Sequence, residues 1–375
     1  MSVVIKEVTS KKELKKFVKF NIELYKGNPY HVPGLIEEEM VTLDKKKNPA
    51  FEVCDAIYFL AYKDGKVVGR IAGMINRRSN ETWNQKYARF GFVDFIDDAE
   101  VVDALFGAVE KWAVGQGMEA LQGPMGFTDM DHEGMLIEGF DQIGTMATIY
   151  NYPYYPKQME RMGYTKDQDW HEFKIYIPDG VPEKHLRIGE IVKKKYGLKV
   201  MKFKNAKSIM PYAQKVFRTL NESYAPLYGF ARLTQKQIDY YLNMLRYDLV
   251  TLIVREEDDE VVGFGISLPN LSKAMQKAKG HLFPFGWIYL LKALKSKPKV
   301  IDLYLTGVLP EYQSKGVNAL LFNDLIPVYK SVGAIYAESN PELETNNAVQ
   351  AQWDYFKREH HKTRRAYIKQ LKGKS

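Results

Sequence analysis

Four residues with acid–base side chains stand close together in the sequence, at Asp129, Asp131, His132 and Glu133. A histidine or carboxylate with a tuned pKa can take a proton from a reacting group, so His132 and Asp131 are candidate catalytic residues. The group could equally form a rim that binds a positively charged group, or a solvated acidic loop. We assign Asp129 and Glu133 to substrate binding. We expect no metal, because adjacent residues on one loop seldom converge on one ion without a distant partner.

A second chemical signal, GVLPEYQSKGVNALLF, lies at Gly307–Phe322 between an apolar strand and a helix. Helix N-termini leave backbone N–H groups unpaired and favour anions. Gly316 would let a phosphate approach the backbone closely, and Lys315 adds positive charge. The alternative is a plain strand-to-helix turn. Neither GxxxxGK[ST] nor GxGxxG occurs, so no P-loop or dinucleotide fingerprint supports the phosphate interpretation.

The elements that would position these residues occur twice along the chain. Residues 56–75 and 249–268 both read as a β-hairpin with Val-Val-Gly after the turn. Each hairpin follows a strand and helical residues, and each precedes a strand, a helix and another strand. The order predicts an α/β protein of two tandem domains, each a mixed β-sheet flanked by helices. The other expected elements are Val3–Val8, Lys11–Tyr25, Ala88–Phe95, Val101–Gly115, Glu119–Gln122, Leu198–Phe203, Ile209–Tyr224, Val300–Leu309, Val317–Val332 and Ala334–Glu338.

The Pro- and Gly-containing stretch Ile177–Lys184 marks the join between the halves. We expect an N-terminal domain over residues 1–178, a linker helix over 179–197 and a C-terminal domain over 198–375. A chain of 375 residues with 45% hydrophobic and 27% charged residues fits two globular domains. The net charge of +8 divides into −6 over residues 1–180 and +14 over the remainder. This asymmetry predicts that the second half meets the anionic ligand.

Cysteine usage and hydropathy favour a cytoplasmic protein. Cys54 is the only cysteine, so an intrachain disulfide and a cysteine-based metal site are excluded, and a reducing compartment fits. The N-terminal residues lack the apolar core of a secretory signal. The longest apolar stretch, Phe283–Leu294, is too short to span a bilayer and contains Pro284, Gly286 and Lys292.

The strand, the Gln313-x-x-Gly316 spacing and the following helix resemble the acyl-CoA signature of the GCN5-related N-acetyltransferases (GNATs), (Gln/Arg)-x-x-Gly-x-(Gly/Ala). The resemblance implies that loop amides hold the CoA pyrophosphate and that the preceding strand hydrogen-bonds pantetheine. Asn318 stands where the family prefers Gly or Ala, and Ala319 follows. The cofactor-binding residues implied are Leu305, Gly307, Val308, Gln313, Ser314, Lys315, Gly316, Val317, Asn318, Ala319 and Asn346.

The segment Ala334–Phe356 resembles the fifth strand and last helix of the same family. Glu338 ends the expected strand near the place implied for the thioester, and it is a second candidate base. Trp353 stands where many members carry a tyrosine that protonates the CoA thiolate. Tyr355, two residues further, is the candidate acid, and core packing is the alternative for both rings.

The first half carries the same strand–helix junction with the opposite charge. Asp97, Asp98 and Glu100 stand where phosphates would lie, and acids there cap a helix and repel a pyrophosphate. We therefore expect a first domain without a CoA site. The segment Gly123–Tyr164 resembles a bacterial subgroup of tandem GNAT-like proteins, some of which are implicated in acyl transfer to sphingoid-type amines.

The segment Asn221–Phe230 corresponds, by the same resemblance, to the loop that shapes the acceptor pocket of this family. The resemblance therefore implies that Tyr224 and Tyr228 bind substrate.

A basic insert follows the second hairpin, because residues 261–301 contain seven lysines and no acidic residue. Its centre, GHLFPFGWIYLLKALKSKPK at residues 280–299, places rings and leucines beside lysines. Residues 271–299 could contact a membrane peripherally, cover a long acyl chain or the CoA 3′-phosphate, or form an ordinary solvated helix. Nucleic acid is not expected, since no nucleic-acid module signature occurs. RNA stays a minority alternative, because tandem folds of this type include peptidoglycan ligases that use aminoacyl-tRNA.

Together these observations predict an acyl-CoA-dependent N-acyltransferase that uses acetyl-CoA or a longer acyl-CoA and no metal. The amine acceptor would lie between the two domains and attack the thioester directly, while His132 or a carboxylate takes the proton. Two alternatives stay open. One is a long-chain acyltransferase that acts on a lipid amine at the membrane surface. The other is a non-catalytic binding protein with a degenerate GNAT site.

Overall fold

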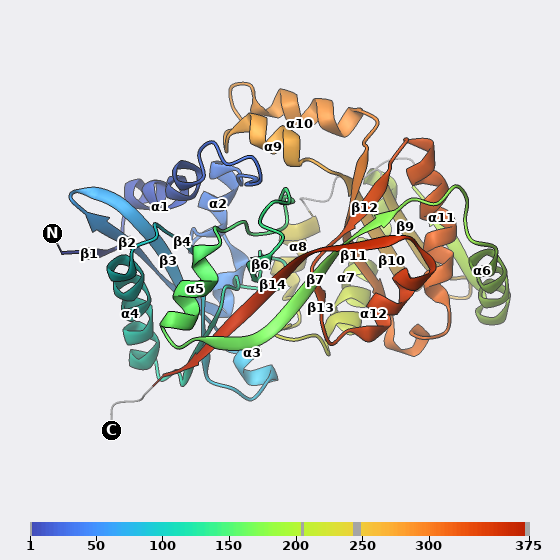
Figure 1. The fold of residues 1–375 in the computed structure, drawn as a ribbon. Helices are drawn as coiled ribbons and strands as arrows, with labels where there is room; N and C mark the ends of the chain where they lie inside the picture. Colours follow the sequence, from blue (N-terminus) through green and yellow to red (C-terminus); the bar gives the residue numbers. More distant parts are fainter. Residues whose placement is uncertain (1, 204–205, 243–248, 372–375) are drawn as a thin grey trace. The chain divides into compact units, whose positions relative to one another are not determined.

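The computed structural model describes residues 2–203, 206–242 and 249–371. They form two compact units, each assembled from separate stretches of the chain (Figure 1). Unit 1 comprises residues 1–171, 271–292 and 362–375. Unit 2 comprises residues 172–270 and 293–361.

Unit 1 is built on a mixed sheet with the strand order β1-β2-β3-β4-β5-β14. Strands β4 and β5 are parallel, and the other neighbours in this order are antiparallel. A short strand, β6, pairs with β14. The strands are β1 (Val4–Glu7), β2 (Cys54–Lys63), β3 (Lys66–Asn76), β4 (Tyr87–Phe95), β5 (Ala120–Gly123), β6 (Met135–Glu138) and β14 (Arg358–Gln370).

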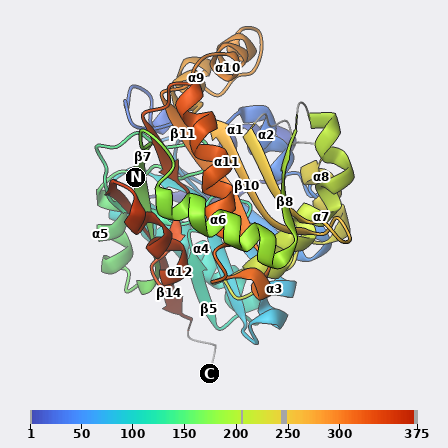
Figure 2. The same ribbon diagram turned by 90° about the vertical axis from the view of Figure 1, so that its right-hand side faces the viewer.

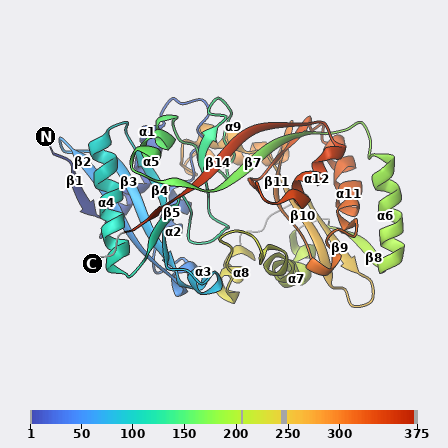
Figure 3. The same ribbon diagram turned by 60° about the horizontal axis from the view of Figure 1, so that its bottom comes forward.

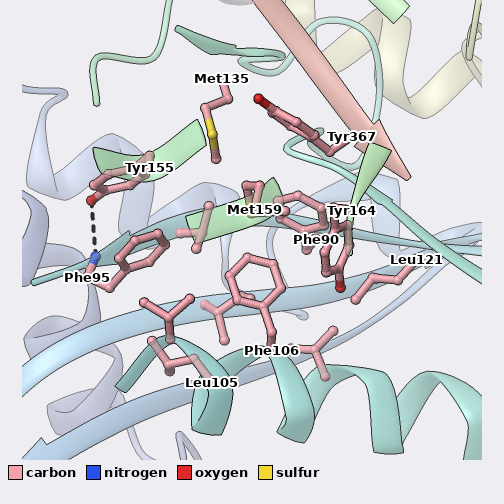
Figure 4. Packing of buried hydrophobic residues seen from close by; sticks show 14 of the residues in the cluster. Phe90, Phe95, Leu105, Phe106, Leu121, Met135, Tyr155, Met159, Tyr164 and Tyr367 are labelled. Carbon is pink, nitrogen blue, oxygen red and sulfur yellow. Dashed lines mark hydrogen bonds between the residues drawn. The ribbon is translucent and has the colours of Figure 1, made fainter. Parts of the chain in front are cut away.

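The helices of unit 1 cover this sheet, and Gly69 allows one of them, α4, to pack closely on it. A Cβ on Gly69 of β3 would lie 2.6 Å from Leu105 Cδ1, so the glycine lets α4 lie directly against the strand (Figure 3). Phe90 and Phe95 of β4 and Phe106 of α4 form an aromatic core beside Tyr155 (Figure 4). The helices are α1 (Lys11–Leu24), α2 (Ile36–Thr42), α3 (Arg77–Thr82), α4 (Ala99–Gly115) and α5 (Tyr154–Arg161), with a 3-10 turn at Pro49–Glu52.

Unit 2 repeats the design with the strand order β8-β9-β10-β11-β12-β7. Strands β11 and β12 are parallel, as β4 and β5 are in unit 1, and β13 pairs with β7. The strands are β8 (Leu198–Lys202), β9 (Leu249–Arg255), β10 (Val261–Pro269), β11 (Val300–Val308), β12 (Tyr336–Ser339), β13 (Glu342–Leu343) and β7 (Thr165–Tyr176).

The helices of unit 2 lie on two faces of its sheet. α7 packs against β10 and β11, while α11 lies on the opposite face and α6 packs on α11 (Figures 2 and 3). The buried core under α11 includes Ile301, Val317, Leu320 and Ala337. The helices are α6 (Glu183–Tyr196), α7 (Ala206–Tyr224), α8 (Gln235–Leu242), α11 (Val317–Ser331) and α12 (Asn347–Ala351), with 3-10 turns at Pro310–Tyr312 and Gln352–Tyr355.

The basic insert forms two helices, α9 (Ser272–Ala278) and α10 (Gly286–Lys295). They lie between β10 and β11 in the chain, but residues 271–292 belong to unit 1. Most of the insert therefore packs with unit 1, although its sequence lies in the second half of the chain.

The structure confirms an α/β protein in which a mixed β-sheet is flanked by helices, and the strand order of unit 1 recurs in unit 2. The sixth strand of each sheet comes from the other half of the chain, since β7 follows α5 and β14 ends the described chain. Neither strand was expected from the sequence. Because the units are defined by contacts in space, the sequence boundaries at residues 178 and 198 stay a prediction.

Candidate active site

The loop after β11 ends at a helix N-terminus that no side chain caps. Gly316 is the N-cap of α11 with a φ of 83°, a left-handed conformation that favours glycine. A Cβ there would also lie 2.8 Å from Ile188 Cγ2 of α6, so packing on α6 requires the glycine as well. The Ala319 amide bonds to the Gly316 carbonyl, so the amides of Val317 and Asn318 before it are left for solvent or a ligand, and the helix dipole favours an anion.

The strand that leads into this loop is paired on one side only over its second half. The pairing of β11 with β12 ends at Leu303↔Ser339, whereas its pairing with β10 continues to Val308. One extra residue, Tyr304, interrupts the register with β10 and forms a bulge. Residues 304–308 of β11 therefore present a strand edge beyond β12, among the strands that the structure describes.

Three polar side chains reach the carbonyl groups of this edge. Asn340 donates to the Tyr304 carbonyl, Tyr224 Oη to the Thr306 carbonyl at 3.0 Å, and Gln313 Nε2 to the Val308 carbonyl at 3.0 Å. Neighbouring residues of a strand direct their backbone groups to opposite edges. The edge beyond β12 therefore carries the backbone groups of residues 304, 306 and 308.

The other residues expected to bind CoA lie around this edge. Leu305 and Gly307 alternate with the edge residues and stand opposite Ile266 and Phe264 of β10. Ser314 has a φ of 58°, and Lys315 Nζ lies 5.3 Å from the Tyr196 ring centroid. Val317 and Ala319 of α11 are buried.

Two asparagines expected at this site have partners of their own. Asn318 Nδ2 donates to Gln352 Oε1 at 3.1 Å. Asn346 caps α12 by accepting from the Val349 amide at 3.3 Å. Their contacts to CoA stay a prediction.

The junction between β4 and α4 in unit 1, which corresponds to this loop, carries carboxylates at the helix N-terminus. Asp98 caps α4 by accepting from the amides of Glu100 and Val101, and Lys63 Nζ lies 2.6 Å from its Oδ2. The hydrogen bond from Lys63 is the largest cause that lowers the pKa of Asp98. An anion would meet a negative charge here, which supports the expectation of a unit without a CoA site.

The acidic cluster of unit 1 lies in the turn between β5 and β6. Asp131 stabilises this turn, since its Oδ2 accepts from the Thr128 amide at 3.0 Å. Asp129 Oδ1 and Glu133 Oε1 are buried atoms without a hydrogen-bond partner in the described part of the chain. Buried carboxyl oxygens are rarely left unpartnered, so these two atoms are suited to a bound cation or ammonium group.

The ionisation of this cluster departs from that of free side chains. Burial raises the pKa of Asp129 to about 7 and that of Asp131 to about 6, and it raises the pKa of Glu133 well above its usual range. Although His132 is exposed, desolvation of its ring lowers its pKa, and the nearby Arg364 guanidinium adds to this shift. A neutral imidazole at pH 7 can accept a proton, as a candidate base requires.

A second polar cluster lies within unit 2. Glu338 of β12 stands opposite Asp302 of β11 in the parallel register, on the face away from α11, because Ile301 and Ala337 beside them enter the core under that helix. Its Oε1 lies 3.5 Å from His361 Nε2, and both side chains are buried. This carboxylate–imidazole pair is a candidate proton acceptor.

The side chains of this cluster are also of the types that bind metal ions in proteins. Glu172, Glu338 and His361 each offer one ligand atom, and these atoms lie within 4.8 Å of one another. Zinc–ligand bonds are about 2.0–2.2 Å long, so two ligands of one ion lie no more than about 4.4 Å apart. A small adjustment would suffice to hold an ion, and the expectation of no metal stays a prediction.

The two rings near the chain's end have different surroundings. Trp353 is buried against Phe322, and its Nε1 donates to Glu342 Oε1 at 2.7 Å. Tyr355 is exposed, and its hydroxyl accepts from Lys184 Nζ at 2.9 Å. Core packing is thus confirmed for Trp353 but wrong for Tyr355. Its role as an acid stays a prediction.

The acceptor-loop tyrosines lie at and after the end of α7. Tyr224 is the last residue of that helix, and its hydroxyl donates to the Thr306 carbonyl of β11. Tyr228 is half-buried in the connection to α8. The structure therefore places Tyr224 beside the predicted pantetheine strand.

Several residues of this site were not anticipated. Tyr304, Thr306 and Asn340 were missed because the bulge at Tyr304 decides which residues of β11 direct their backbone groups to the edge beyond β12. Glu172 and His361 were missed because they lie on β7 and β14, whose charged sequences carry no strand pattern.

Comparison with known proteins connects this geometry to a family. Residues 215–357 match the acetyltransferase (GNAT) family. The chain is 29% identical over 380 residues to protein YghO of Escherichia coli K12, covering 98% of this chain and 95% of that protein. It is 28% identical over 370 residues to the bacterial ceramide synthase of Caulobacter vibrioides, covering 96% and 95%.

A solved structure resembles the whole chain. It is a tandem GNAT protein from the clavulanic acid biosynthesis pathway, which aligns over 100% of both chains with a TM-score of 0.59 and 11% identity. At that identity the likeness shows the fold alone.

Proposed function

Because residues 215–357 match the GNAT family model and the whole chain has the fold of a tandem GNAT protein, we propose that it is an acyl-CoA-dependent N-acyltransferase with a long-chain amine acceptor. One observation carries the donor assignment. The edge of residues 304–308, which does not pair with β12, leads directly to the N-terminus of α11 at Gly316, which no side chain caps. The edge suits the amide-bearing pantetheine arm, and the helix terminus suits the pyrophosphate.

The acceptor class rests on the relative named bacterial ceramide synthase. Ceramide is the amide of a fatty acid and a sphingoid amine, so the proposed reaction joins an acyl chain to a long-chain amine. The assignment of Asp129 and Glu133 to substrate binding stays a prediction. Because the donor is a CoA ester, we also propose a cytoplasmic location.

The proposed chemistry is one acyl transfer with a proton acceptor and a proton donor. An alkylamine is mostly protonated at neutral pH, so it must lose a proton before its nitrogen attacks the thioester carbon. Glu338, paired with His361, would take this proton. The N–C bond forms, the nitrogen releases its second proton to solvent, the C–S bond breaks, and the electron pair leaves with sulfur as a thiolate.

Glu342 would return a proton to the thiolate. Burial raises its pKa to about 8, although the hydrogen bond from Trp353 acts in the opposite direction. At pH 7 it is therefore mainly protonated and can act as an acid, which the indole of Trp353 cannot. Tyr355 stays the alternative acid, and His132 and Asp131 stay the alternative bases.

The donor is tested by calorimetric titration of the purified protein with CoA, acetyl-CoA and palmitoyl-CoA. We expect palmitoyl-CoA to bind most tightly. Binding that is independent of chain length would favour transfer of a small acyl group to a soluble amine. The donor assignment is wrong if none of the three binds.

The reaction is tested by mass spectrometry of the products formed from palmitoyl-CoA and a sphingoid amine. We expect an N-acyl product, and a strong loss of kcat in Glu338→Gln with unchanged CoA affinity. The matched comparison is His132→Ala. A loss confined to His132→Ala would move the base to unit 1, and CoA binding without any product would indicate a non-catalytic protein.

A further inference from the structure

The basic insert is attached to unit 1 through its first helix. Ser272 Oγ donates to the Gly144 carbonyl at 2.8 Å, and Gln276 Nε2 to the carbonyls of Pro29 and His31 at 2.8 and 3.0 Å. Ala274, Met275 and Ala278 of α9 are buried. These contacts fix α9 and therefore position α10, the outer helix of the pair (Figures 1 and 2).

In contrast, α10 and the turn before it expose large apolar side chains. Half of the 14 large hydrophobic residues exposed in the described chain lie within residues 283–294. Phe283 and Phe285 are 68% and 65% exposed. Trp287 is exposed although its indole N–H is satisfied by the Pro284 carbonyl at 2.9 Å. The other exposed residues are Ile288, Tyr289, Leu291 and Leu294.

Only a narrow stripe of α10 is turned inward. Gly286 is buried and Leu290 and Ala293 are half-buried, at the spacing of one helix face. The remaining large apolar side chains of the helix are 41–43% exposed. A concentration of exposed rings on one short element marks an interaction surface.

The charged residues of the insert are all lysines. Lys292 and Lys295 lie on α10, Lys297 and Lys299 follow it, and Lys273, Lys277 and Lys279 lie on or next to α9. None of the seven forms an ion pair with another described residue. Lysines near an anionic membrane surface are attracted to it electrostatically.

We propose that α10, the turn at residues 283–285 and the flanking lysines bind the surface of an anionic lipid bilayer. Rings at the headgroup level and lysines on long aliphatic stems are the residue types of interfacial helices. A helix of 10 residues is only about 15 Å long, which suits a position along the surface. None of the helices in the described ranges has the length and apolar content needed to cross a membrane.

A second copy of the chain fits this surface less well. Self-association would bring two sets of seven lysines together without an acidic residue from the insert to neutralise them. A nucleic acid would match the charge, but not the aliphatic Ile288, Leu291 and Leu294. The proposal does not depend on the enzymatic function proposed above.

The test is flotation of the full chain with neutral phosphatidylcholine vesicles and with vesicles that also contain phosphatidylglycerol, at low and high salt. We expect binding to the anionic vesicles only, weakened by salt. Phe285→Ser/Trp287→Ser and, separately, Lys292→Glu/Lys295→Glu should each weaken binding by about tenfold or more. Circular dichroism checks that both variants stay folded.

The matched control is Leu186→Ser/Ile191→Ser on α6, which also exposes apolar residues and ends with three lysines. This variant should bind vesicles as the wild type does. Absence of binding, or equal binding by the Phe285/Trp287 variant, would overturn the proposal. A dimer that the Phe285/Trp287 variant dissociates, or tighter binding to an oligonucleotide than to the vesicles, would also overturn it.

Discussion

At the scale of single residues, the CoA loop shows why the most obvious substitution is a poor test. Gly316 has a left-handed backbone and faces Ile188 at a distance that no Cβ tolerates. A larger residue there would disturb α6 as well as any ligand. Lys315, which is exposed on the same loop, can be changed without this steric conflict.

We predict that Lys315→Glu weakens CoA binding by about tenfold, since it places a negative charge beside the N-terminus of α11. The measurement is calorimetric titration at low salt. Lys194→Glu on α6 is the control, because it changes the net charge equally on another exposed site. Equal affinities of the two variants would show that the charge at Lys315 does not meet the pyrophosphate.

The buried Glu342 leads to a prediction about pH. Its pKa is raised from an ordinary value near 4.5 to about 8, mainly by burial, so the folded chain holds a proton that the unfolded chain has released. Its contribution to stability is therefore lost as the pH rises from about 4.5 to 8, with a slope of up to about 1.4 kcal/mol per pH unit.

Glu342→Gln should remove this contribution. We expect the variant to lose less stability than the wild type between pH 5 and pH 8, as measured by urea unfolding at several pH values. Parallel curves for the two proteins would show that Glu342 is not held in its protonated form.

At the scale of elements, the position of α10 depends on one glycine. A Cβ on Gly286 would lie 1.8 Å from the His281 carbonyl oxygen, a backbone atom that cannot move without changing the turn between α9 and α10. We predict that Gly286→Ala loosens this turn at a cost of about 1–3 kcal/mol. Hydrogen exchange of peptides over residues 279–295 should become faster.

Gly107→Ala in α4 is the matched control. Nothing lies within 4 Å of a Cβ at that position, so alanine should stabilise the helix by about 0.5–1 kcal/mol. The two identical substitutions in helices should therefore act with opposite sign. Unchanged exchange in Gly286→Ala would mean that the turn adapts freely.

Helices and strands were predictable from the sequence where apolar residues follow the period of one kind of element. The hairpin β2–β3 and the strand β11 were found from apolar strands bounded by turn residues, and α4 and α11 from helical periodicity. β14 was missed because its sequence, REHHKTRRAYIKQ, is mostly charged or polar, yet Arg364 and Lys362 are buried in it. Burial of such residues depends on partners that no local pattern reveals.

The candidate site was predictable to a similar degree. The spacing of Gln313 and Gly316 marked the loop correctly as a helix N-terminus. The side chains that contact the edge of β11 beyond β12 could not be predicted, because the bulge at Tyr304 decides which carbonyls Tyr224 and Asn340 reach. His361 depended on a strand that was itself missed.

At the scale of the whole molecule, the exchange of the sixth strands ties the two halves of the sequence together. Unit 1 takes β14 from the end of the described chain, and Tyr367 of that strand is buried in the core around Phe90 and Phe106. Residues 367–370 pair with β5. A fragment of residues 1–178 therefore lacks a strand and a core ring of its own unit.

We predict that deletion of residues 358–375 unfolds unit 1. Loss of a buried aromatic residue alone costs about 3–5 kcal/mol, and the lost strand adds to this, against a total stability of about 5–15 kcal/mol for a domain. The measurement is hydrogen exchange over β2–β5, with deletion of residues 372–375 as the control. A synthetic peptide of residues 358–371 should restore protection when added to the truncated chain, because the missing strand is then supplied in trans. Full protection of β5 in the truncated chain without the peptide would show that unit 1 does not depend on β14.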